Sequence, residues 1–510
     1  MKKFTSVVIF VLFSIHCFAQ LPNWIWAKSG LGANNDGGYS IAVDLNGNIF
    51  VGGNFDSPSI NFGAFTLTNS GNGTSDIFIV KYSNSGNVLW AKAFGGNNND
   101  HLSKISTDSL GNVIFVGSFS STTITFNTTT LINSGASSIF DMYFVKYNAN
   151  GTNLIWAKSA GGEGYDKAND LVIDAFGNII ITGYFKSQTI TFDAISLNRI
   201  GYDENIYVVK YNAIGNVIWA QSAGGNYMDV PYKIAADSDG NIIITAVLTS
   251  FVVYFGTYQL SNPSINYHDN IFIIKYSATG NFLWVKKVEN VYNSFGNCWI
   301  TTDADNNIIV CGVFTDPTIS FGNFTLSNAG LFSSSDIFIV KYDLNANVLW
   351  AKSAGGSNYE FVRSITVDDS GDLIISGQFK SQSIFSAPNI LTNSYIGYYD
   401  IFIAKYSSSG NLIWTESIGS NNDDFSGCTS LDNIGNILIT GSFRSQNILF
   451  GSDTLYNFGN DDVFIAKLSN SNVYTVNQIA CGYFNSPSGN YTWTNSGSYL
   501  DTITNISGIG

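Results

Sequence analysis

Six acidic residues recur at one place in a repeated sequence, and carboxylates arranged in this way can hold a cation or a polar ligand. Each stands eight residues before a conserved turn Asp of its own copy; the six are Asp36, Asp100, Asp166, Asp229, Glu360 and Asp424. Phe295 takes this place in the fifth copy. If the copies close around an axis, the six carboxylates form a ring near a channel mouth, where Ca²⁺ is a candidate ligand. The alternative hypothesis is that each acid caps backbone N–H groups of its own loop.

Residues for other catalytic chemistry are scarce. After residue 19 the chain has only two histidines, His101 and His268, and they are not related by the repeat. The sequence therefore gives little support for a His-ligated metal site or for Ser-His-Asp catalysis. The Gly-Gly pairs do not stand between a strand and a helix, where a phosphate-binding loop would. Paired carboxylates in a channel could support a hydrolase or lyase. A channel-sited enzyme is therefore the alternative to a non-catalytic binding protein, which is the main expectation.

The charge pattern argues against nucleic acid as a partner. The formal net charge is −14, and only 23 residues are Lys or Arg. Over half of these cations are repeated features: Lys81, Lys146, Lys210, Lys275, Lys341, Lys405 and Lys467 in one phrase, and Lys28, Lys92, Lys158, Lys286 and Lys352 in another. A basic surface for phosphates is therefore not indicated. An acidic chain with neutral polar loops favours glycans, cations or other proteins as partners.

Two phrases mark every copy of the repeat. The first is DIFIVKYSNSGNVLWAK, residues 76–92, whose Trp recurs at steps of 64, 66, 63, 65, 66 and 64 residues: Trp26, Trp90, Trp156, Trp219, Trp284, Trp350 and Trp414. The second turns through D-x-x-G-N or a close variant, with Asp44, Asp108, Asp174, Asp237, Asp303, Asp368 and Asp432 at its start. Asp and Gly at these positions are typical of a type I turn closed by a left-handed residue. We therefore predict that the turn Asp residues are structural.

These phrases predict two hairpins, hence four short antiparallel strands, in each copy. Strands such as 77–82 are apolar on both faces, which indicates that sheets are stacked on either side of them. The sequence therefore predicts an all-β, seven-bladed β-propeller of four-stranded antiparallel blades. A segment like residues 57–69, between the hairpins, is expected to be a further hairpin or an ordered loop. A solenoid is the alternative fold.

The two ends of the repeated region argue for a closed ring. Residues 24–28 are a fourth strand with no first three before it, and residues 462–468 are a third strand whose following partner, 473–476, lacks the Trp-Ala-Lys phrase. Pairing these two strands would complete the seventh blade and leave no open sheet edge. We therefore assign residues 20–475 to the propeller, closed by its N-terminal strand.

The first nineteen residues predict export. Lys2 and Lys3 precede an apolar run that ends near Ala19 and Gln20, which is typical of a secretory signal peptide cleaved there. No later stretch is long and apolar enough to span a membrane. We therefore expect a monomeric protein that is secreted or held at the cell surface, with no integral membrane segment.

The cysteines outside the signal peptide match no metal or redox motif. They are Cys298, Cys311, Cys428 and Cys481. Cys298 and Cys311 flank one hairpin turn, in a register that puts them one residue out of opposition. A disulfide between them and two free thiols are both left open.

Taken together, the pattern WAKS…GGN…D…GN…FG…D.FI.KY resembles the SBBP-type β-propeller repeat of secreted bacterial proteins over residues 23–475. This resemblance implies an extracellular seven-bladed propeller and no defined activity. Residues 481–510 resemble a β-rich module that normally continues with Gly-Cys-Asp, so residues 476–510 are expected to be an incomplete module or tail. The phrase S-x-x-G-N-x-x-W also resembles the Trp-docking motif of quinoprotein-type propellers, which makes a quinone-dependent oxidoreductase a further alternative.

The loop lengths predict which face binds a ligand. Connections from the fourth strand to the next first strand, and from the second to the third, are long and emerge on one face, whereas the other face carries tight turns. Because ligand contacts are usually made by loops, we expect a glycan, a protein or another extracellular ligand on the long-loop face.

Overall fold

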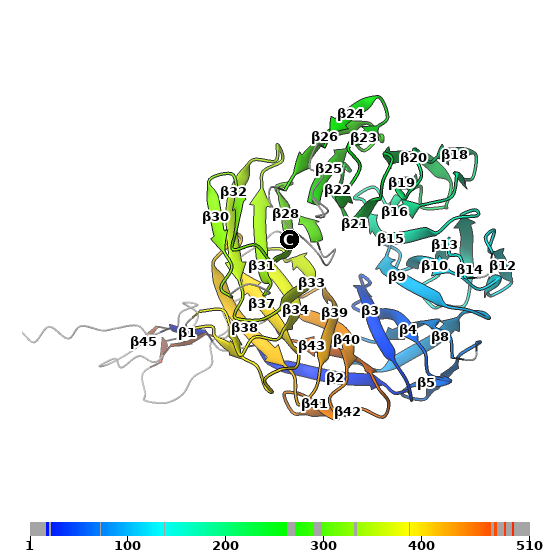
Figure 1. The fold of residues 1–510 in the computed structure, drawn as a ribbon. Coiled ribbons are helices and arrows are strands. Elements are labelled where there is room, and N and C mark those ends of the chain that lie inside the picture. The colour runs from blue at the N-terminus through cyan, green and yellow to red at the C-terminus, as the bar shows by residue number, and fades with distance from the viewer. Residues whose placement is uncertain are drawn as a thin grey trace, which may run out of the picture. The chain divides into compact units, whose positions relative to one another are not determined.

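The computed structural model describes residues 17–19, 22–71, 73–136, 138–262, 271–288, 298–330, 334–386, 388–470, 474–476, 484–485 and 492–493. Every regular element in these residues is a β-strand, and seven four-stranded antiparallel sheets form a propeller within residues 23–470 (Figure 1). The predicted all-β, seven-bladed fold is confirmed. Within these ranges no helix has the length and hydropathy needed to cross a bilayer.

Each blade is written from its innermost to its outermost strand. The first three blades are β3 (Asp36–Val43), β4 (Ile49–Phe55), β7 (Asp76–Tyr82) and β8 (Val88–Phe94); β9 (Asp100–Thr107), β10 (Val113–Phe119), β13 (Asp141–Tyr147) and β14 (Leu154–Ala160); and β15 (Asp166–Ile173), β16 (Ile179–Phe185), β19 (Asn205–Tyr211) and β20 (Val217–Gly224). The fourth, fifth and sixth are β21 (Asp229–Ala236), β22 (Ile242–Leu248), β25 (Ile271–Tyr276) and β26 (Phe282–Lys287); β27 (Cys298–Thr302), β28 (Ile308–Phe314), β31 (Asp336–Tyr342) and β32 (Val348–Ala354); and β33 (Glu360–Val367), β34 (Leu373–Phe379), β37 (Asp400–Tyr406) and β38 (Leu412–Ile418). The seventh is β39 (Asp424–Leu431), β40 (Ile437–Phe443), β43 (Asp462–Leu468) and β2 (Trp24–Gly30).

The seventh blade is completed by the N-terminal strand, as the sequence predicts. In Figure 1 the blue β2 lies beside the orange β43, and the register pairs Trp26 with Lys467 and Ala27 with Ala466. A parallel bridge between Asn35 and Asp461 continues this junction. The ring is therefore closed by backbone hydrogen bonds between strands more than 400 residues apart.

The segment between the second and third strands of each blade is a short hairpin, which resolves the choice between a hairpin and a loop. The first blade shows its place: β6 contacts β8 of the same blade, and β5 contacts β2 of the preceding blade, so the hairpin fills the gap between two blades at the perimeter. The hairpins are β5 (Ser59–Phe62) with β6 (Phe65–Thr68), β11 (Thr123–Phe126) with β12 (Thr129–Ile132), β17 (Thr189–Phe192) with β18 (Ile195–Asn198), β23 (Val252–Phe255) with β24 (Tyr258–Ser261), β29 (Thr318–Phe321) with β30 (Phe324–Ser327), β35 (Ser383–Ile384) with β36 (Leu391–Thr392), and β41 (Asn447–Phe450) with β42 (Asp453–Tyr456).

Residues 1–22 and 471–510 form a separate unit. Its described elements are β1 (Cys17–Ala19) paired with β44 (Tyr474–Val476), and β45 (Phe484–Asn485) paired with β46 (Thr492–Trp493). The rest of the predicted signal peptide and of the predicted C-terminal module, including Cys481, lies outside the described residues.

The strands are buried on both faces because each sheet is stacked between two others. All seven residues of β7 are buried, with Ile77, Phe78 and Val80 fully inaccessible. Phe78 and Val80 pack in a cluster with Leu438 and Ile465 of the seventh blade, whereas Ile77 and Ile79 pack in a cluster with residues of the second blade. Alternate side chains of one strand therefore fill two different inter-blade cores.

Each turn Asp caps its own turn. The Asp174 carboxylate accepts hydrogen bonds from the backbone N–H groups of Phe176 and Asn178, both at 2.9 Å, and Gly177 closes the turn with a φ of 79°. Its other oxygen forms an ion pair of 2.8 Å with Lys210 of β19, and both side chains are nearly inaccessible. Burial alone would raise the pKa of Asp174, but the hydrogen bonds from Lys210 and Asn178 outweigh it and lower the pKa.

The same buried ion pair occurs in all seven blades, which the sequence analysis did not predict. The Nζ–Oδ2 distances lie between 2.6 and 3.1 Å in the pairs Lys81–Asp44, Lys146–Asp108, Lys210–Asp174, Lys275–Asp237, Lys341–Asp303, Lys405–Asp368 and Lys467–Asp432. A repeated Lys in the middle of an apolar strand is therefore explained by a repeated turn Asp in the same blade.

In several blades the repeated Lys and Trp also bond to the next blade. Lys210 and Trp219 are opposite each other on β19 and β20, and both donate a hydrogen bond to the backbone oxygen of Ala278 in the following blade, at 3.1 and 3.2 Å. The Trp219 ring lies so close to Gly280 that a Cβ there would stand 2.7 Å from it. Gly280 has a φ of 85°, so glycine is required for its backbone conformation as well.

Cys298 and Cys311 are free, buried thiols. Cys298 is opposite Gly312 and Cys311 is opposite Trp299, so the two cysteines are one residue out of register, as the sequence indicates.

We predict that Trp219→Ala lowers the free energy of unfolding by about 3–5 kcal/mol, because it empties a buried contact between two blades. Ile218→Ala is the matched control, since the neighbouring Ile218 side chain is 48% exposed and should cost under about 1 kcal/mol. Denaturant unfolding of both variants measures the difference; equal losses would contradict the role given to Trp219.

We also predict that Lys210→Met lowers the free energy of unfolding by about 3–5 kcal/mol at neutral pH, because Asp174 is left buried without its cation. Adding Asp174→Asn should restore part of that loss, since the uncompensated charge is then removed while an oxygen remains for the N–H groups of Phe176 and Asn178. A double variant less stable than Lys210→Met would show that the pair is not the relevant interaction.

Candidate functional site: loop carboxylates and a central channel

The six repeated acids lie at the first position of the innermost strand in six blades, and all are buried. Asp166 is representative: Oδ1 accepts hydrogen bonds from the N–H groups of Lys186 and Ser187, and Oδ2 accepts one from Ser187 Oγ at 2.6 Å. The corresponding serines are Ser57, Ser121, Ser187, Ser250, Ser381 and Ser445. The carboxylates thus have partners of the kind that the capping hypothesis requires.

The fifth copy departs from this pattern at both positions. Phe295, in place of the acid, lies outside the described residues, and Asp316 stands where the other copies have their capping serine. The acid and its serine therefore change together within one chain. This is expected if the two side chains form one local unit.

A second set of buried acids lies beside the first. The third strand of five blades begins with Asp, at Asp76, Asp141, Asp336, Asp400 and Asp462. Asp76 Oδ2 accepts the N–H of Ser70 at 2.6 Å, and its charge interacts with that of Asp100 in the next blade. Burial raises the pKa of both Asp76 and Asp100 to about 6. Gly95 packs closely against Asp76, because a Cβ at this position would stand 2.0 Å from Asp76 Oδ1.

No group of three or more His, Cys, Asp or Glu side chains in the described part of the chain is placed to hold a metal ion. The Ca²⁺ hypothesis for the six acids stays a prediction, while hydrogen bonds within the protein account for the contacts that these acids make. Cation binding at this position would have to compete with the serine and backbone donors.

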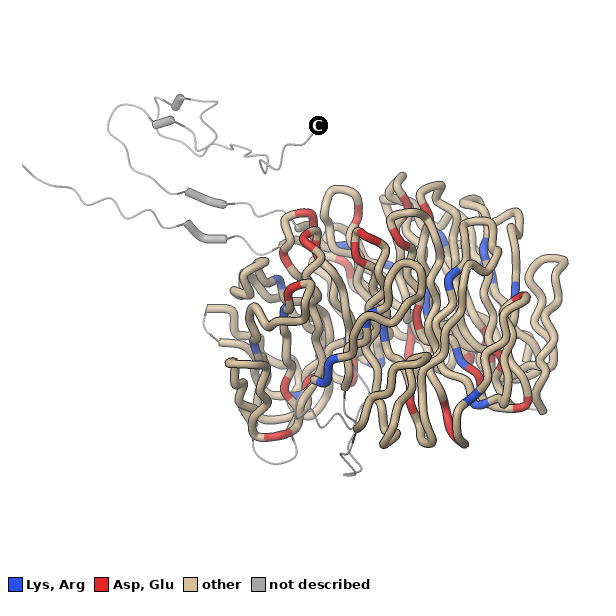
Figure 2. Tube along the Cα trace, turned by 90° about the horizontal axis from the view of Figure 1, so that it is seen from above, with Lys and Arg blue, Asp and Glu red and all other residues tan. Residues whose placement is uncertain are grey.

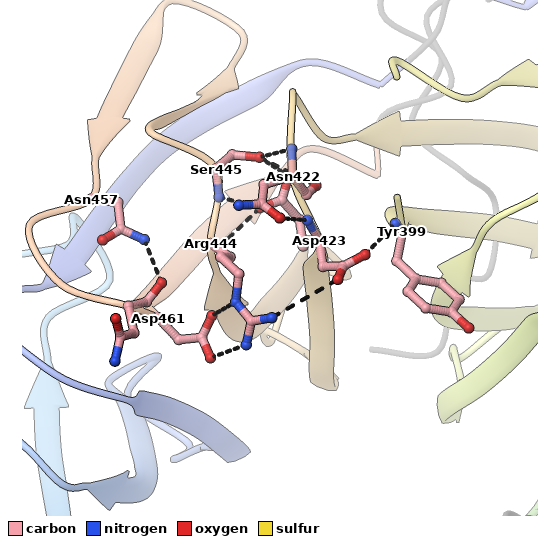
Figure 3. Close-up of polar contacts among 9 residues, drawn as sticks. Tyr399, Asn422, Asp423, Arg444, Ser445, Asn457 and Asp461 are labelled. Carbon is pink, nitrogen blue, oxygen red and sulfur yellow. Dashed lines mark hydrogen bonds and ion pairs between the residues drawn. The ribbon is translucent and has the colours of Figure 1, made fainter. Parts of the chain in front are cut away.

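Charged side chains on the long-loop face are paired with one another. In Figure 3, Arg444 donates two hydrogen bonds to Asp461, at 2.9 and 2.8 Å, and approaches Asp423 within 3.9 Å. Asp423 in turn accepts the N–H of Tyr399. Lys186 makes the equivalent contacts with Asp203 and Glu204 in the third blade. These clusters order the loops, and because each has two acids around one cation, each keeps one net negative charge.

The seven innermost strands surround a central channel of about 1020 Å³. In six of them the register shifts by one residue at the same height, at Gly38/Ser40, Leu102/Lys104, Ala168/Asp170, Pro231/Lys233, Val362/Ser364 and Ser426/Cys428. Each shift is a β-bulge, a feature that redirects side chains and is common next to functional sites.

The bulges lie in the part of the first strand in which the copies differ from one another. The bulged residue and the next one are Tyr39-Ser40, Ser103-Lys104, Asn169-Asp170, Tyr232-Lys233, Arg363-Ser364 and Gly427-Cys428, with Cys298-Trp299 in the regular fifth strand. By contrast, the first residue of this strand and the turn that follows the strand repeat closely from blade to blade. The channel therefore carries an asymmetric set of side chains inside a symmetric scaffold, and the sequence analysis missed it. Comparing the copies column by column along the first strand would have revealed it.

The chain resembles proteins of the WD-repeat class at low identity. No family model matches it. It is 25% identical, over 84% of its length, to an uncharacterized WD repeat-containing protein of Acanthamoeba polyphaga mimivirus, and the match covers 36% of that protein. It is 20% identical, over 45% of its length, to regulatory protein FlaEY of Caulobacter vibrioides, and the match covers 23% of that protein. Sqt1 from Chaetomium thermophilum aligns with 90% of this chain and 100% of that chain, at 9% identity and a TM-score of 0.41.

The chain thus spans about a third or less of the length of these two curated relatives. It is a seven-bladed β-propeller with WD-repeat relatives, and the narrower resemblance to SBBP-type repeats stays a prediction.

We predict a pH dependence of stability from Glu360, whose pKa is raised to about 8, mainly by burial. The unfolded side chain loses its proton near pH 4.5, so the folded state binds more protons between these values and loses stability as the pH rises through them. From pH 6 to pH 8 this group should cost roughly 2–3 kcal/mol. Glu360→Gln should remove that part of the decline, as measured by denaturant unfolding at each pH.

Glu163→Gln is the control, because the exposed Glu163 lies on an equivalent loop. It should decline with pH as the parent does, because Glu360 is intact in this variant. A decline in Glu360→Gln as steep as in the parent would contradict the assignment.

Proposed function

We propose that this protein is a secreted, non-catalytic β-propeller scaffold that binds an extracellular protein on its long-loop face. The fold supports a binding role, because a closed ring of sheets presents many loops on a rigid support. The signal-like residues 1–19 support export.

The observation that carries the proposal is a set of exposed aromatic side chains on this face. They lie on the loops that precede a first or third strand or follow a second strand, and are Tyr165, Tyr202, Tyr227, Phe251, Tyr395, Tyr398 and Phe458. Tyr202 is 85% exposed. Two pairs are in ring contact, Tyr227 with Phe251 and Tyr395 with Tyr398.

This composition favours a protein partner. Tyr among Ser, Gly and Asn gives a large contact area at a small cost in side-chain entropy, and aromatic residues are enriched at protein interfaces. The cations on the same face are held in ion pairs, as Arg444 is with Asp461, so the aromatic rings are the groups left for contact with a partner. Aromatic stacking on a glycan is the second outcome that the same side chains allow.

The alternative of a quinone-dependent oxidoreductase receives no specific support. The Trp-docking phrase that suggested it joins blades here, as the contact of Trp350 with Gly410 and its hydrogen bond to Ser408 illustrate. The carboxylates considered for a hydrolase or lyase are buried and bonded to serines and backbone groups. We therefore propose binding without catalysis.

The test is selection of ligands on the purified propeller from a phage-displayed peptide library, with a glycan array in parallel. We predict that Tyr202→Ala and Tyr395→Ala each weaken the selected peptides about thirtyfold, as loss of an aromatic hot spot does. Ile214→Ala, on the tight-turn face, is the control and should change nothing. Tyr-dependent binding of glycans alone would replace the protein partner with a glycan, and binding unaffected by either Tyr variant would overturn the long-loop site.

A further inference from the structure

The central channel gathers cations within an acidic protein. Its lining includes Lys104 of β9, Lys233 of β21 and Arg363 of β33, which come from the second, fourth and sixth blades. The chain as a whole carries a formal charge of −14, and many of its acidic residues lie at the rims of the propeller in Figure 2. Asp108, Asp170 and Asp174 also line the channel, so its net charge depends on which of these acids are already paired.

These three cations are not used in the ion pairs that are repeated within the blades. Those pairs are made by the repeated lysines of the third strands, and no ion pair within 4 Å involves Lys104, Lys233 or Arg363 in the described ranges. Lys233 lies over the Trp299 ring at 5.9 Å, and Arg363 donates a hydrogen bond to Gln378 at 3.3 Å. Their charges are therefore available to a ligand.

The acids that line the channel do not neutralise this charge. Asp108 and Asp174 are already paired with lysines of their own blades. Asp170, which is 4% exposed, accepts the N–H of Ile234 with one oxygen, while its other oxygen is buried without a partner in the described structure. Asp170 also interacts electrostatically with Lys104. Three cations against one unpaired acid leave the channel lining with two net positive charges.

We propose that the channel binds an organic polyanion, a small molecule that carries two or three carboxylate or phosphate groups on an apolar body. Lys104, Lys233 and Arg363 would receive the anionic groups, since charge-assisted hydrogen bonds to Lys and Arg are the strong ones in partly buried sites. Tyr39, Trp299 and Phe425 also line the channel and would contact the body of the ligand. A volume of about 1020 Å³ is ample for such a molecule.

This inference goes beyond the proposed function, because the channel residues differ from the long-loop tyrosines. The bulges support it independently, because they place Arg363 at the extra residue and Lys104 and Lys233 directly after it, in three of the six bulged strands. A purely structural role for the channel would not require cations at alternate blades.

The test uses benzene-1,3,5-tricarboxylate as the probe, with the uncharged 1,3,5-tris(hydroxymethyl)benzene as its neutral counterpart, in calorimetric titrations of the purified full chain. We predict that the tricarboxylate binds and the neutral compound does not. Lys104→Gln, Lys233→Gln and Arg363→Gln should each weaken binding at least about tenfold, the loss expected for one charge-assisted contact. Lys28→Gln, at an exposed position on β2, is the control and should leave the affinity unchanged.

Asp170→Asn protects the test against variants that fail to fold. It removes the one unpaired acid while keeping an oxygen for the N–H of Ile234, so it should tighten binding several-fold, a gain that damage to the fold cannot produce. Absence of binding to the parent, equal weakening by Lys28→Gln, or unchanged affinity in Asp170→Asn would each overturn the proposal. Replacing the probe with inositol hexakisphosphate distinguishes carboxylate from phosphate preference in the same channel.

Discussion

A buried ion pair between a strand Lys and a turn Asp, repeated in every blade, is the interaction on which the ring depends. Removing two charges from water is costly, and the cost is offset here because each partner has further bonds. Asp174 also holds its own turn, and Lys210 reaches a backbone oxygen of the next blade, which Trp219 shares. One repeated phrase of sequence therefore stabilises a turn, joins the two hairpins of a blade and connects that blade to the next. Because each of these lysines is paired with an Asp, its charge can be buried inside the sheet.

Because every blade contains the same ion pair, the repeat separates positions that have a structural role from positions that vary. The Trp and the turn Asp recur in all seven blades because each serves a contact of the repeated scaffold, and the loop acid with its serine, as at Asp166 and Ser187, is a unit that six blades share. The bulges in the innermost strands lie at the axis, where side chains such as Asp170 and Ser364 bond to the next blade while others face the channel. Those positions differ from blade to blade, and they hold Lys, Arg, Asp, Tyr, Trp and Cys in a ring that has no symmetry.

The two proposed surfaces differ in their electrostatics. On the long-loop face, cations are held in ion-pair clusters, such as Arg444 with Asp423 and Asp461, and aromatic rings are exposed, so contacts there depend chiefly on shape and buried apolar area. In the channel, Lys104, Lys233 and Arg363 outnumber the unpaired acid. Because the whole chain is strongly acidic, an anion would be repelled at long range and held only at short range, where the lining cations act.

The amino-acid sequence by itself determined the number of blades, the four strands of each and the closure by residues 24–28, because these follow from a period near 65 residues and from the alternation of side chains along a strand. It also placed Cys298 and Cys311 one residue out of opposition. Tertiary structure alone decided that Lys210 meets Asp174, that Asp166 meets Ser187, and that Lys104 faces the channel. Those outcomes depend on which strands become neighbours and on a one-residue bulge. Such a bulge changes the face of the strand to which a side chain points, while the sequence pattern around it stays the same.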